Sequence, residues 1–307
     1  MTLIQNKRKN NRSHLIDGLR IGSYFLGAAG TLLAVQAMYV IFATPKLSPP
    51  ENSGYDFVKD GILVEYSYNS EDLDEKDEFH LVMIGDSPVE GIGHDCHSKT
   101  LGGCAALAFS EHLKQSVRFW SFGKSGLTAE GIEREMVPLI KGMYTKKKKG
   151  IDAIVVSVGV NNVLIGQSAN KFRQEVQALL QSIEKYSCGA KIIVIQLLDF
   201  AQMPFLPYPL RGVFSWKSKI LQMELETVIS ELRLNGLNIC MSFLPNVHEL
   251  LGGNREHWLW EYLRLSKDER QQIHLSDFFA VDNFHPGGYG CAIISKILVD
   301  AFILEQI

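Results

Sequence analysis

Short apolar runs rich in Val and Ile recur along the chain from residue 80 onward, and longer amphipathic segments separate them. The runs cover residues 80–85, 117–123, 152–159, 191–198 and 237–243. Most are nearly continuous in apolar residues, which is typical of strands that are buried on both faces of a sheet. Helices are expected near residues 100–115, 128–142, 168–186, 212–235 and 288–304. This alternation predicts an α/β fold in which helices cover both faces of a parallel sheet of about five strands.

Polar and glycine-rich stretches follow these runs at the places where ligands usually bind. In an open parallel sheet, ligands bind outside the carboxyl ends of the strands. The first run is followed by Gly-Asp-Ser-Pro at 85–88, and the second by FGKSGLT at 122–128. The third is followed by GVNNV at 159–163, and the fifth, after an irregular stretch, by AVDNFHPGGYG at 280–290. We therefore expect these four stretches to meet at one edge of the sheet.

Ser87, Asp282 and His285 form a candidate catalytic triad. A serine hydroxyl is a poor nucleophile until a base removes its proton, and His285 is the candidate base. Asp282 lies three residues before His285, in a tight loop closed by Pro286. From there its carboxylate is able to accept the imidazole Nδ1–H, which leaves Nε2 free for Ser87.

Three groups are candidates for an oxyanion hole. The oxyanion of a tetrahedral intermediate needs preorganised donors, and the N–H groups of Ser87 and Gly126 and the amide of Asn161 would supply them. Each residue also has a purely structural interpretation, because serine and asparagine cap helices, glycine forms turns and an Asp-x-x-His pair occurs in surface loops. Their joint occurrence at strand ends favours catalysis over these separate roles.

Four blocks of the sequence resemble the SGNH (GDSL-type) serine hydrolase family: GDS at 85–87, GKSGLT at 123–128, GVNN at 159–162 and DNFHP at 282–286. The resemblance covers roughly residues 79–307. It implies a flavodoxin-like three-layer α/β/α sandwich and a mechanism that needs no metal or organic cofactor. The family's functional positions map onto Ser87 as nucleophile, Gly126 and Asn161 in the oxyanion hole, and Asp282 with His285 as the remaining pair.

The third block departs from the family pattern. It usually reads Gly-x-Asn-Asp, whereas Asn162 stands here in place of the aspartate. Because Asn161 is retained, we expect a changed local hydrogen-bond network and retained activity. The chain also resembles a bacterial branch of membrane-anchored, lysophospholipase-like GDSL esterases. The resemblance lies in the uncharged N-terminal segment at 21–43 with its Pro-rich exit, in VSVGVNNV at 156–163 and in FLPYPLR at 205–211.

Residues 21–43 carry no charge and predict a transmembrane helix. At 1.5 Å per residue they span roughly 34 Å, against about 30 Å for a bilayer core. Cations precede the segment at Lys7, Arg8, Lys9, Arg12 and Arg20, and Lys46 is the only nearby cation after it. This bias places the N-terminus in the cytoplasm and the rest outside it. An uncleaved anchor is favoured over a signal peptide, since the run is long and lacks a clear cleavage site, and over a buried core helix.

The expected organisation follows from these segments. Residues 1–20 form a cytoplasmic basic tail, 21–43 a membrane anchor, 44–78 a linker and 79–307 an extracytoplasmic or periplasmic hydrolase domain. The linker assignment rests on TPKLSPPENSG at 44–54 and on an acidic stretch that follows it. Cys96 and Cys104 are close enough in sequence to be bridged in an oxidising compartment, and no cysteine or histidine spacing indicates structural zinc.

The leading functional hypothesis is a serine ester hydrolase that acts through a Ser87 acyl-enzyme on a lipid, a lysophospholipid or an O-acylated glycan. An envelope O-acyltransferase would use the same residues, and a non-catalytic envelope binding protein is a further alternative. The net charge of −3 indicates no nucleic-acid partner. Residues 203–212 are expected to border the site, while Trp258 and Trp260 either line an acyl pocket or belong to a helix packed on the core.

Overall fold

The computed structural model describes residues 30–40, 42–51, 55–59, 62–65, 78–144, 150–203, 205–252, 263 and 265–304. The basic tail at 1–20, the first part of the expected anchor, and Trp258 with Trp260 lie outside these residues. All five candidate site residues lie within them.

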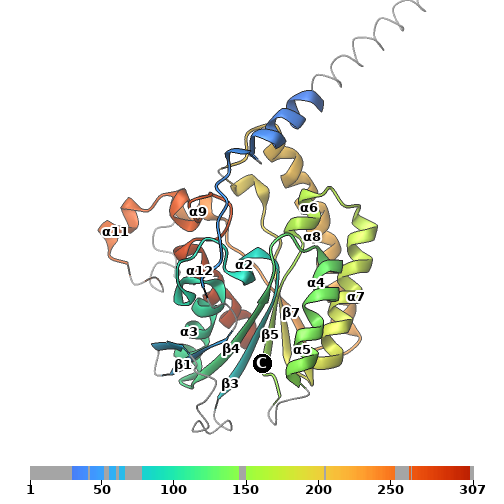
Figure 1. Ribbon diagram of the computed structural model, residues 1–307, viewed down its shortest axis with the longest axis vertical. Coiled ribbons are helices and arrows are strands. Elements are labelled where there is room, and N and C mark those ends of the chain that lie inside the picture. Colours follow the sequence, from blue (N-terminus) through green and yellow to red (C-terminus); the bar gives the residue numbers. More distant parts are fainter. Residues whose placement is uncertain are drawn as a thin grey trace, which may run out of the picture.

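Five parallel strands form the centre of the sheet, as the apolar runs predict (Figure 1). They are β3 (Phe79–Gly85), β4 (Val117–Gly123), β5 (Ala153–Ser157), β6 (Lys191–Ile195) and β7 (Ile239–Ser242). Their order is β4-β3-β5-β6-β7, and every neighbouring pair is parallel. This is the flavodoxin-like order, in which ligands bind at the crevice between the first and third strands. That crevice here lies between the carboxyl ends of β3 and β5.

Two further strands extend the sheet at one edge. β1 (Tyr55–Lys59) and β2 (Ile62–Glu65) pair antiparallel, and β1 also pairs antiparallel with β4. Both strands fall within residues 44–78, the predicted linker, so that segment contains part of the sheet. Pairing with β1 covers backbone groups of β4 that an edge strand would leave open.

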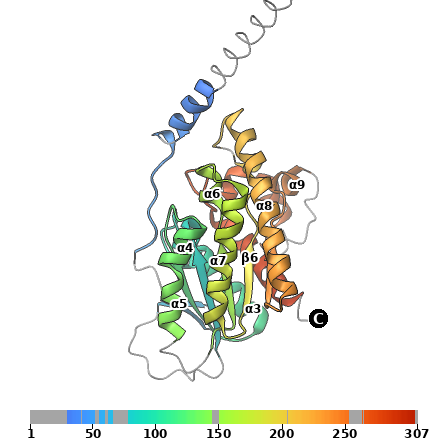
Figure 2. The ribbon, with the colours of Figure 1, turned by 90° about the vertical axis from the view of Figure 1, so that its right-hand side faces the viewer.

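Helices cover both faces of the sheet (Figures 1 and 2). One face is covered by α3 (Leu101–Leu113) and α12 (Gly288–Ile303). The other is covered by α4 (Ala129–Glu135), α5 (Val137–Tyr144), α7 (Ala169–Ser187) and α8 (Leu210–Leu234). Residues of β3 alternate between the two cores, with Leu81 and Met83 in one and Val82 and Ile84 in the other. This explains why the strand is apolar without a break.

The expected helix at 128–142 is interrupted at Met136, which separates α4 from α5. Pro138 lies in the first turn of α5, where its missing N–H breaks the preceding hydrogen-bond ladder. The remaining short elements are α2 (Ser87–Glu90), η2 (His97–Lys99), α6 (Val160–Leu164), η3 (Phe200–Gln202), α9 (Val247–Gly252), α11 (Lys267–Gln272) and η4 (Leu275–Phe278).

Residues 30–40 and 42–43 are helical and leave the domain at the carboxyl edge of the sheet (Figure 1). Leu33, Ala37 and Val40 pack against the core cluster beneath them. Within the described residues, no helix has both the length and the apolar character needed to cross a membrane. The expected span at 21–43 lies only partly within those residues.

Candidate active site

Ser87 lies at the point where β3 turns into α2. The helix-capping position is taken by Asp86, whose side chain makes no capping bond, and Pro88 occupies the first turn. Ser87 is the first residue of α2 and is 7% exposed. A Cβ on Gly85 would lie 2.5 Å from the carbonyl oxygen of Ser157, so only glycine permits this close approach of β3 to β5. The local geometry therefore places Ser87 at the crevice between β3 and β5, and Asp86 is the N-cap residue of α2.

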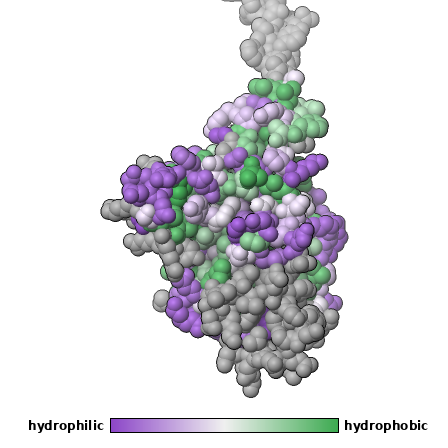
Figure 3. Space-filling model, turned by 60° about the vertical axis from the view of Figure 1, so that its left-hand side comes forward, coloured by the Kyte–Doolittle hydropathy of each residue, from purple (hydrophilic) through white to green (hydrophobic). Residues whose placement is uncertain are grey.

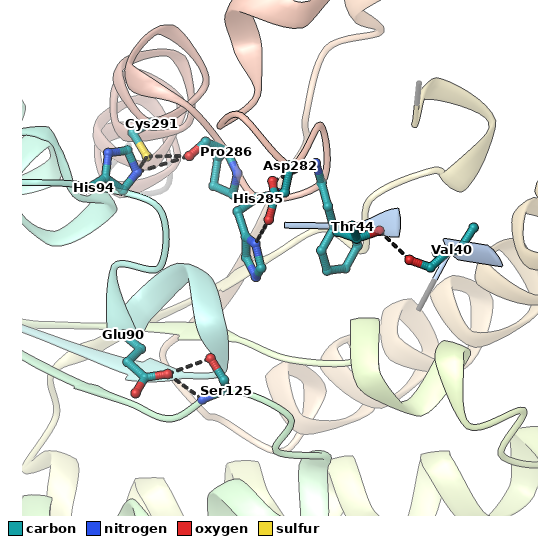
Figure 4. A network of polar contacts seen from close by, with 10 residues as sticks. Val40, Thr44, Glu90, His94, Ser125, Asp282, His285, Pro286 and Cys291 are labelled. Atoms are coloured by element: carbon teal, nitrogen blue, oxygen red, sulfur yellow. Dashed lines mark hydrogen bonds and ion pairs between the residues drawn. The ribbon is translucent and has the colours of Figure 1, made fainter. Parts of the chain in front are cut away.

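Asp282 and His285 form a hydrogen-bonded pair (Figure 4). The Nδ1–H of His285 donates to Oδ2 of Asp282 over 2.6 Å. The other carboxylate oxygen accepts the backbone N–H groups of Phe284 and His285, at 3.0 and 3.1 Å. Burial by itself raises the pKa of Asp282, but the hydrogen bonds from His285 and the backbone outweigh it and hold the pKa below its usual range. Asp282 is therefore an ionised partner that fixes the ring of His285.

Ser87 and His285 line the same cavity. Because Ser87 follows directly on β3, this shared lining places the loop at 280–286 beside the carboxyl end of that strand. The structure therefore brings the three members of the expected triad to one place, although about 195 residues separate the serine from the other two.

Asn161 reaches the same crevice from α6. Its Nδ2 donates to the carbonyl oxygen of Leu127 over 2.9 Å and to Oδ2 of Asp86 over 3.3 Å. Asp86 also accepts a hydrogen bond from the Ser157 hydroxyl at 2.9 Å. Burial raises the pKa of Asp86 to about 6, although the hydrogen bond from Ser157 partly opposes the increase. No role was predicted for Asp86, although its position inside the GDS block at 85–87 marks it in the sequence.

Gly126 lies in the loop between β4 and α4. Its φ of +81° is in the left-handed region that favours glycine, and it is exposed. The adjacent Ser125 donates its N–H and its hydroxyl to the Glu90 carboxylate of α2, both over 2.6 Å (Figure 4). Glu90 thus ties the glycine loop to the helix that begins with Ser87. No motif in the sequence pointed to this contact.

Asn162 is fully buried and links three segments. Its Oδ1 accepts the N–H of Ala129 at the start of α4, over 3.2 Å. Its Nδ2 donates to Oε1 of Gln167 and, over 3.3 Å, to Oε2 of Glu175. An aspartate at this position has no hydrogen to donate and would face the Glu175 carboxylate. These partners give a physical reason for the departure of the third block from the family pattern.

His94 contacts the loop at 280–286 that carries Asp282 and His285. Its Nε2–H donates to the carbonyl oxygen of Pro286 over 3.0 Å, and the thiol of Cys291 lies 3.5 Å from the same nitrogen (Figure 4). Burial lowers the pKa of His94, and the hydrogen bond to Pro286 partly opposes this decrease. His94 therefore positions the segment that follows His285.

The cavity beside Ser87 has largely apolar walls drawn from both layers of the fold. Its lining includes Ile195, Leu197, Met203, Leu244 and Ile293. Met203 begins the segment that was expected to border the site, and Phe205 of that segment packs on Phe284, with ring centroids 5.1 Å apart. An extended apolar group bound next to Ser87 would therefore find an apolar environment.

Neither a disulfide bond nor a metal-binding cluster is found among the described residues. All five cysteines are described, and all are free, including Cys96 and Cys104. Burial raises the pKa of the Cys104 thiol to about 12, so this side chain stays protonated. Among the described residues, no cluster of three or more His, Cys, Asp or Glu side chains is placed to hold a metal ion.

Residues 83–292 match the GDSL-like Lipase/Acylhydrolase family. No curated protein matches the chain. The fold is similar to that of the lipase Lip_vut3 from a goat rumen metagenome, with 14% identity, a TM-score of 0.51, and coverage of 73% of this chain and 97% of the lipase. A family 3 carbohydrate esterase from Clostridium thermocellum gives 14% identity, a TM-score of 0.48, and coverage of 74% and 96%. The likeness to Lip_vut3 supports the fold.

Proposed function

Because this chain belongs to the GDSL-like lipase/acylhydrolase family, we propose that it hydrolyses acyl esters through a covalent intermediate on Ser87. The observation that carries this proposal is the Asp282–His285 pair, whose 2.6 Å hydrogen bond orients the imidazole at the cavity that Ser87 lines. The family match extends across this serine and both members of the pair.

The first step is attack of the serine on the ester carbonyl. His285 takes the Ser87 proton at Nε2, because its Nδ1–H is held by Asp282. The Ser87 oxygen bonds to the carbonyl carbon, and the imidazolium then gives the proton to the leaving alkoxide as the ester bond breaks. A water molecule then attacks the carbonyl carbon of the acyl-enzyme in the same way, with His285 taking its proton. The bond to Ser87 breaks, His285 returns the proton to the Ser87 oxygen, and the carboxylic acid is released.

The oxyanion is stabilised by donors from three loops in this proposal. The N–H of Ser87 is available because the first N–H groups of a helix have no acceptor within it. Gly126 supplies a second N–H. Asn161 supplies an N–H of its side-chain amide, the one that donates the longer of its two hydrogen bonds, to Asp86, and that N–H is shared with the oxyanion. Removing one such donor typically costs about 2.7–4 kcal/mol of transition-state stabilisation.

The acyl group occupies the apolar cavity, which favours an aliphatic acyl chain over a polar one. Contact with Leu197 and Ile293 removes the chain from water, and each buried CH₂ contributes about 0.8 kcal/mol. This preference, together with the resemblance to the lysophospholipase-like branch, supports a lipid or lysophospholipid ester as substrate.

We also propose that residues 21–43 anchor the enzyme in a membrane, with the N-terminus in the cytoplasm and the hydrolase domain outside it. The absence of charge over 23 residues and the cations that precede them support this topology. A periplasmic reporter fused after residue 307 tests it: activity is expected outside the cytoplasm, and a signal confined to the cytoplasm contradicts it.

The catalytic proposal is tested with the full-length protein in detergent. Hydrolysis of p-nitrophenyl acetate, butyrate and octanoate is expected, together with labelling by a fluorophosphonate probe. Ser87→Ala should abolish both, whereas Ser276→Ala, a change at an exposed serine, should preserve both. Unchanged hydrolysis by Ser87→Ala rules out Ser87 as the nucleophile, and no hydrolysis or labelling of the native protein contradicts an esterase.

A further inference from the structure

Large apolar side chains are exposed around the candidate site. They are between 65% and 81% exposed, and we call them the apolar rim: Phe42, Ile165, Tyr208, Trp216 and Val281. Val281 precedes Asp282, and Ile165 follows α6. Tyr208 lies just before α8, and Trp216 lies in its second turn. Ile165, Tyr208 with Trp216, and Val281 therefore come after the carboxyl ends of β5, β6 and β7, on the side of the sheet that holds Ser87, and Phe42 belongs to the helical residues 42–43 that precede the sheet. Exposed apolar groups gathered at one site mark an interaction surface.

The N-terminal helix is fixed to this same edge. Gln36 donates from Nε2 to the carbonyl oxygen of Tyr208 over 2.6 Å and accepts the N–H of Leu210 over 3.1 Å. Gln36 is the most polar side chain of the uncharged segment at 21–43, and in an apolar environment its amide needs such partners. The helix is therefore attached to the domain at the rim.

The chain that follows the helix also packs on the domain. Pro50 is buried, and the N–H of Gly93 donates to the carbonyl oxygen of Ser48 over 3.1 Å. Leu47 lies against the same loop, close to Ala280 of the triad loop. Residues 47–50 thus do not form a free spacer, and the orientation of the domain follows that of the helix.

The position of Gln36 places the rim at the level of a lipid surface. In a helical span over 21–43, Gln36 lies seven residues, or about 10 Å, before the end of the span. Tyr208, to which it is bonded, is then held close to the membrane surface and not away from it. The remaining faces of the helix expose Leu32, Val35 and Met38. Figure 3 shows hydrophobic surface where this helix meets the domain.

The side chains of the rim suit the headgroup region. Trp and Tyr are enriched at membrane–water interfaces, where one end of the ring is apolar and the other is hydrated. The guanidinium of Arg211 lies 5.1 Å from the centre of the Tyr208 ring and brings a positive charge to the same place. A cation beside interfacial aromatic rings complements anionic lipid headgroups.

We propose that the apolar rim docks on the membrane that holds the N-terminal segment, so that the cavity beside Ser87 takes acyl esters directly from the lipid surface. This inference rests on the proposed esterase function and on the proposed anchor. It narrows the substrate class to esters of membrane lipids and disfavours soluble glycans.

Fluorescence quenching by brominated lipid tests the docking itself. Full-length protein is reconstituted in vesicles of phosphatidylcholine and phosphatidylglycerol with bromine at carbons 6 and 7 of one chain. The difference in emission between the native protein and Trp216→Phe isolates Trp216 from the other three tryptophans. We expect this difference to fall by at least half in brominated vesicles. A difference signal that is not quenched overturns the proposal, whether or not the enzyme is active.

Activity on two substrates tests the consequence for catalysis. Trp216→Glu combined with Ile165→Glu should lower hydrolysis of lysophosphatidylglycerol in vesicles at least tenfold, and should change p-nitrophenyl acetate hydrolysis less than twofold. The conservative pair Trp216→Phe and Ile165→Leu should leave both rates near native. Equal loss on both substrates, or no loss on vesicles, overturns the proposal. So does a detergent-stable dimer that the glutamate pair dissociates, since the rim then binds a second copy.

The controls separate this inference from the proposed function. If Ser87→Ala keeps both activities, the esterase assignment fails while the quenching result still reports docking. If Ser87→Ala loses both activities and the glutamate pair loses neither, the esterase assignment holds and docking fails.

Discussion

Replacing Asn162 by aspartate, the residue that resemblance to the family leads one to expect there, should destabilise this protein. Asn162 is fully buried and donates to Gln167 and Glu175 while it accepts the N–H of Ala129. Aspartate keeps the acceptor and loses both donated bonds. It also places a second carboxylate 3.3 Å from the Glu175 oxygen that now receives the amide.

The magnitude follows from these contacts. Two unit charges about 3.3 Å apart repel by roughly 5 kcal/mol at an effective dielectric constant near 20. The new carboxyl group avoids part of this cost by taking up a proton, and Gln167 can rotate its amide toward it. Loss of hydrogen bonds to a charged partner costs about 1.5–3 kcal/mol. We therefore expect the free energy of unfolding to fall by about 2–4 kcal/mol at pH 7.

The loss should depend on pH in a defined direction. Burial and Glu175 both raise the pKa of the new carboxyl group in the folded state above its unfolded value of about 3.9. The folded state then binds the proton more tightly, so stability is lost as pH rises through the raised pKa. The difference from the native protein should be small near pH 4 and largest at pH 7.

Urea unfolding of four proteins checks this reasoning: native, Asn162→Asp, Glu175→Gln and the double variant. The double variant exchanges carboxylate and amide between the two positions, so it should recover at least 1 kcal/mol relative to the sum of the single changes, about the value of one hydrogen bond. Additive effects, or an Asn162→Asp loss that does not change between pH 4 and 7, would refute the electrostatic explanation.

Three other changes have expected outcomes. Asp282→Asn should lower kcat about 10³–10⁴-fold with an unchanged circular dichroism spectrum, because the imidazole loses its ionised partner; near-native kcat contradicts the triad. For Asp86, a folded pKa of about 6 lies above the usual 3.8, so its carboxyl group stabilises the fold below about pH 4 and this contribution disappears by pH 7. Urea unfolding should therefore show the stability of Asp86→Asn, relative to the native protein, rising by roughly 2 kcal/mol from pH 4 to 7, and a constant difference contradicts this. Leu244→Trp should fill the cavity and lower the octanoate-to-acetate rate ratio at least tenfold, and an unchanged ratio contradicts the acyl site.

Much of the fold could be read from local patterns. Strands that are buried on both faces need apolar side chains on both sides, and the apolar runs that form β3 to β7 meet this requirement. The order of polar blocks after those runs also determined which residues meet, because parallel strands end at a common edge. Ser87, Asp282 and His285 could therefore be placed together before any contact was known.

Other features depend on partners that no local pattern announces. β1 has only five residues and joins the sheet because β4 leaves an edge to pair with. Glu90 holds the glycine loop through Ser125, which lies 35 residues further along the chain. The attachment of Gln36 to Tyr208 spans 172 residues. Each of these contacts forms only when the two segments have packed against each other. The amino acids of one segment alone therefore do not predict it.

The sequence by itself determined the layered architecture and which residues meet at the candidate site, since both follow from periodicity and from the order of residue types along the chain. Only the tertiary structure decided why Asn162 replaces an aspartate, what lines the cavity beside Ser87, and where the N-terminal helix meets the domain. The physical reason is that burial and charge pairing are properties of neighbours in space. A residue's environment therefore becomes definite only when distant segments have packed against it.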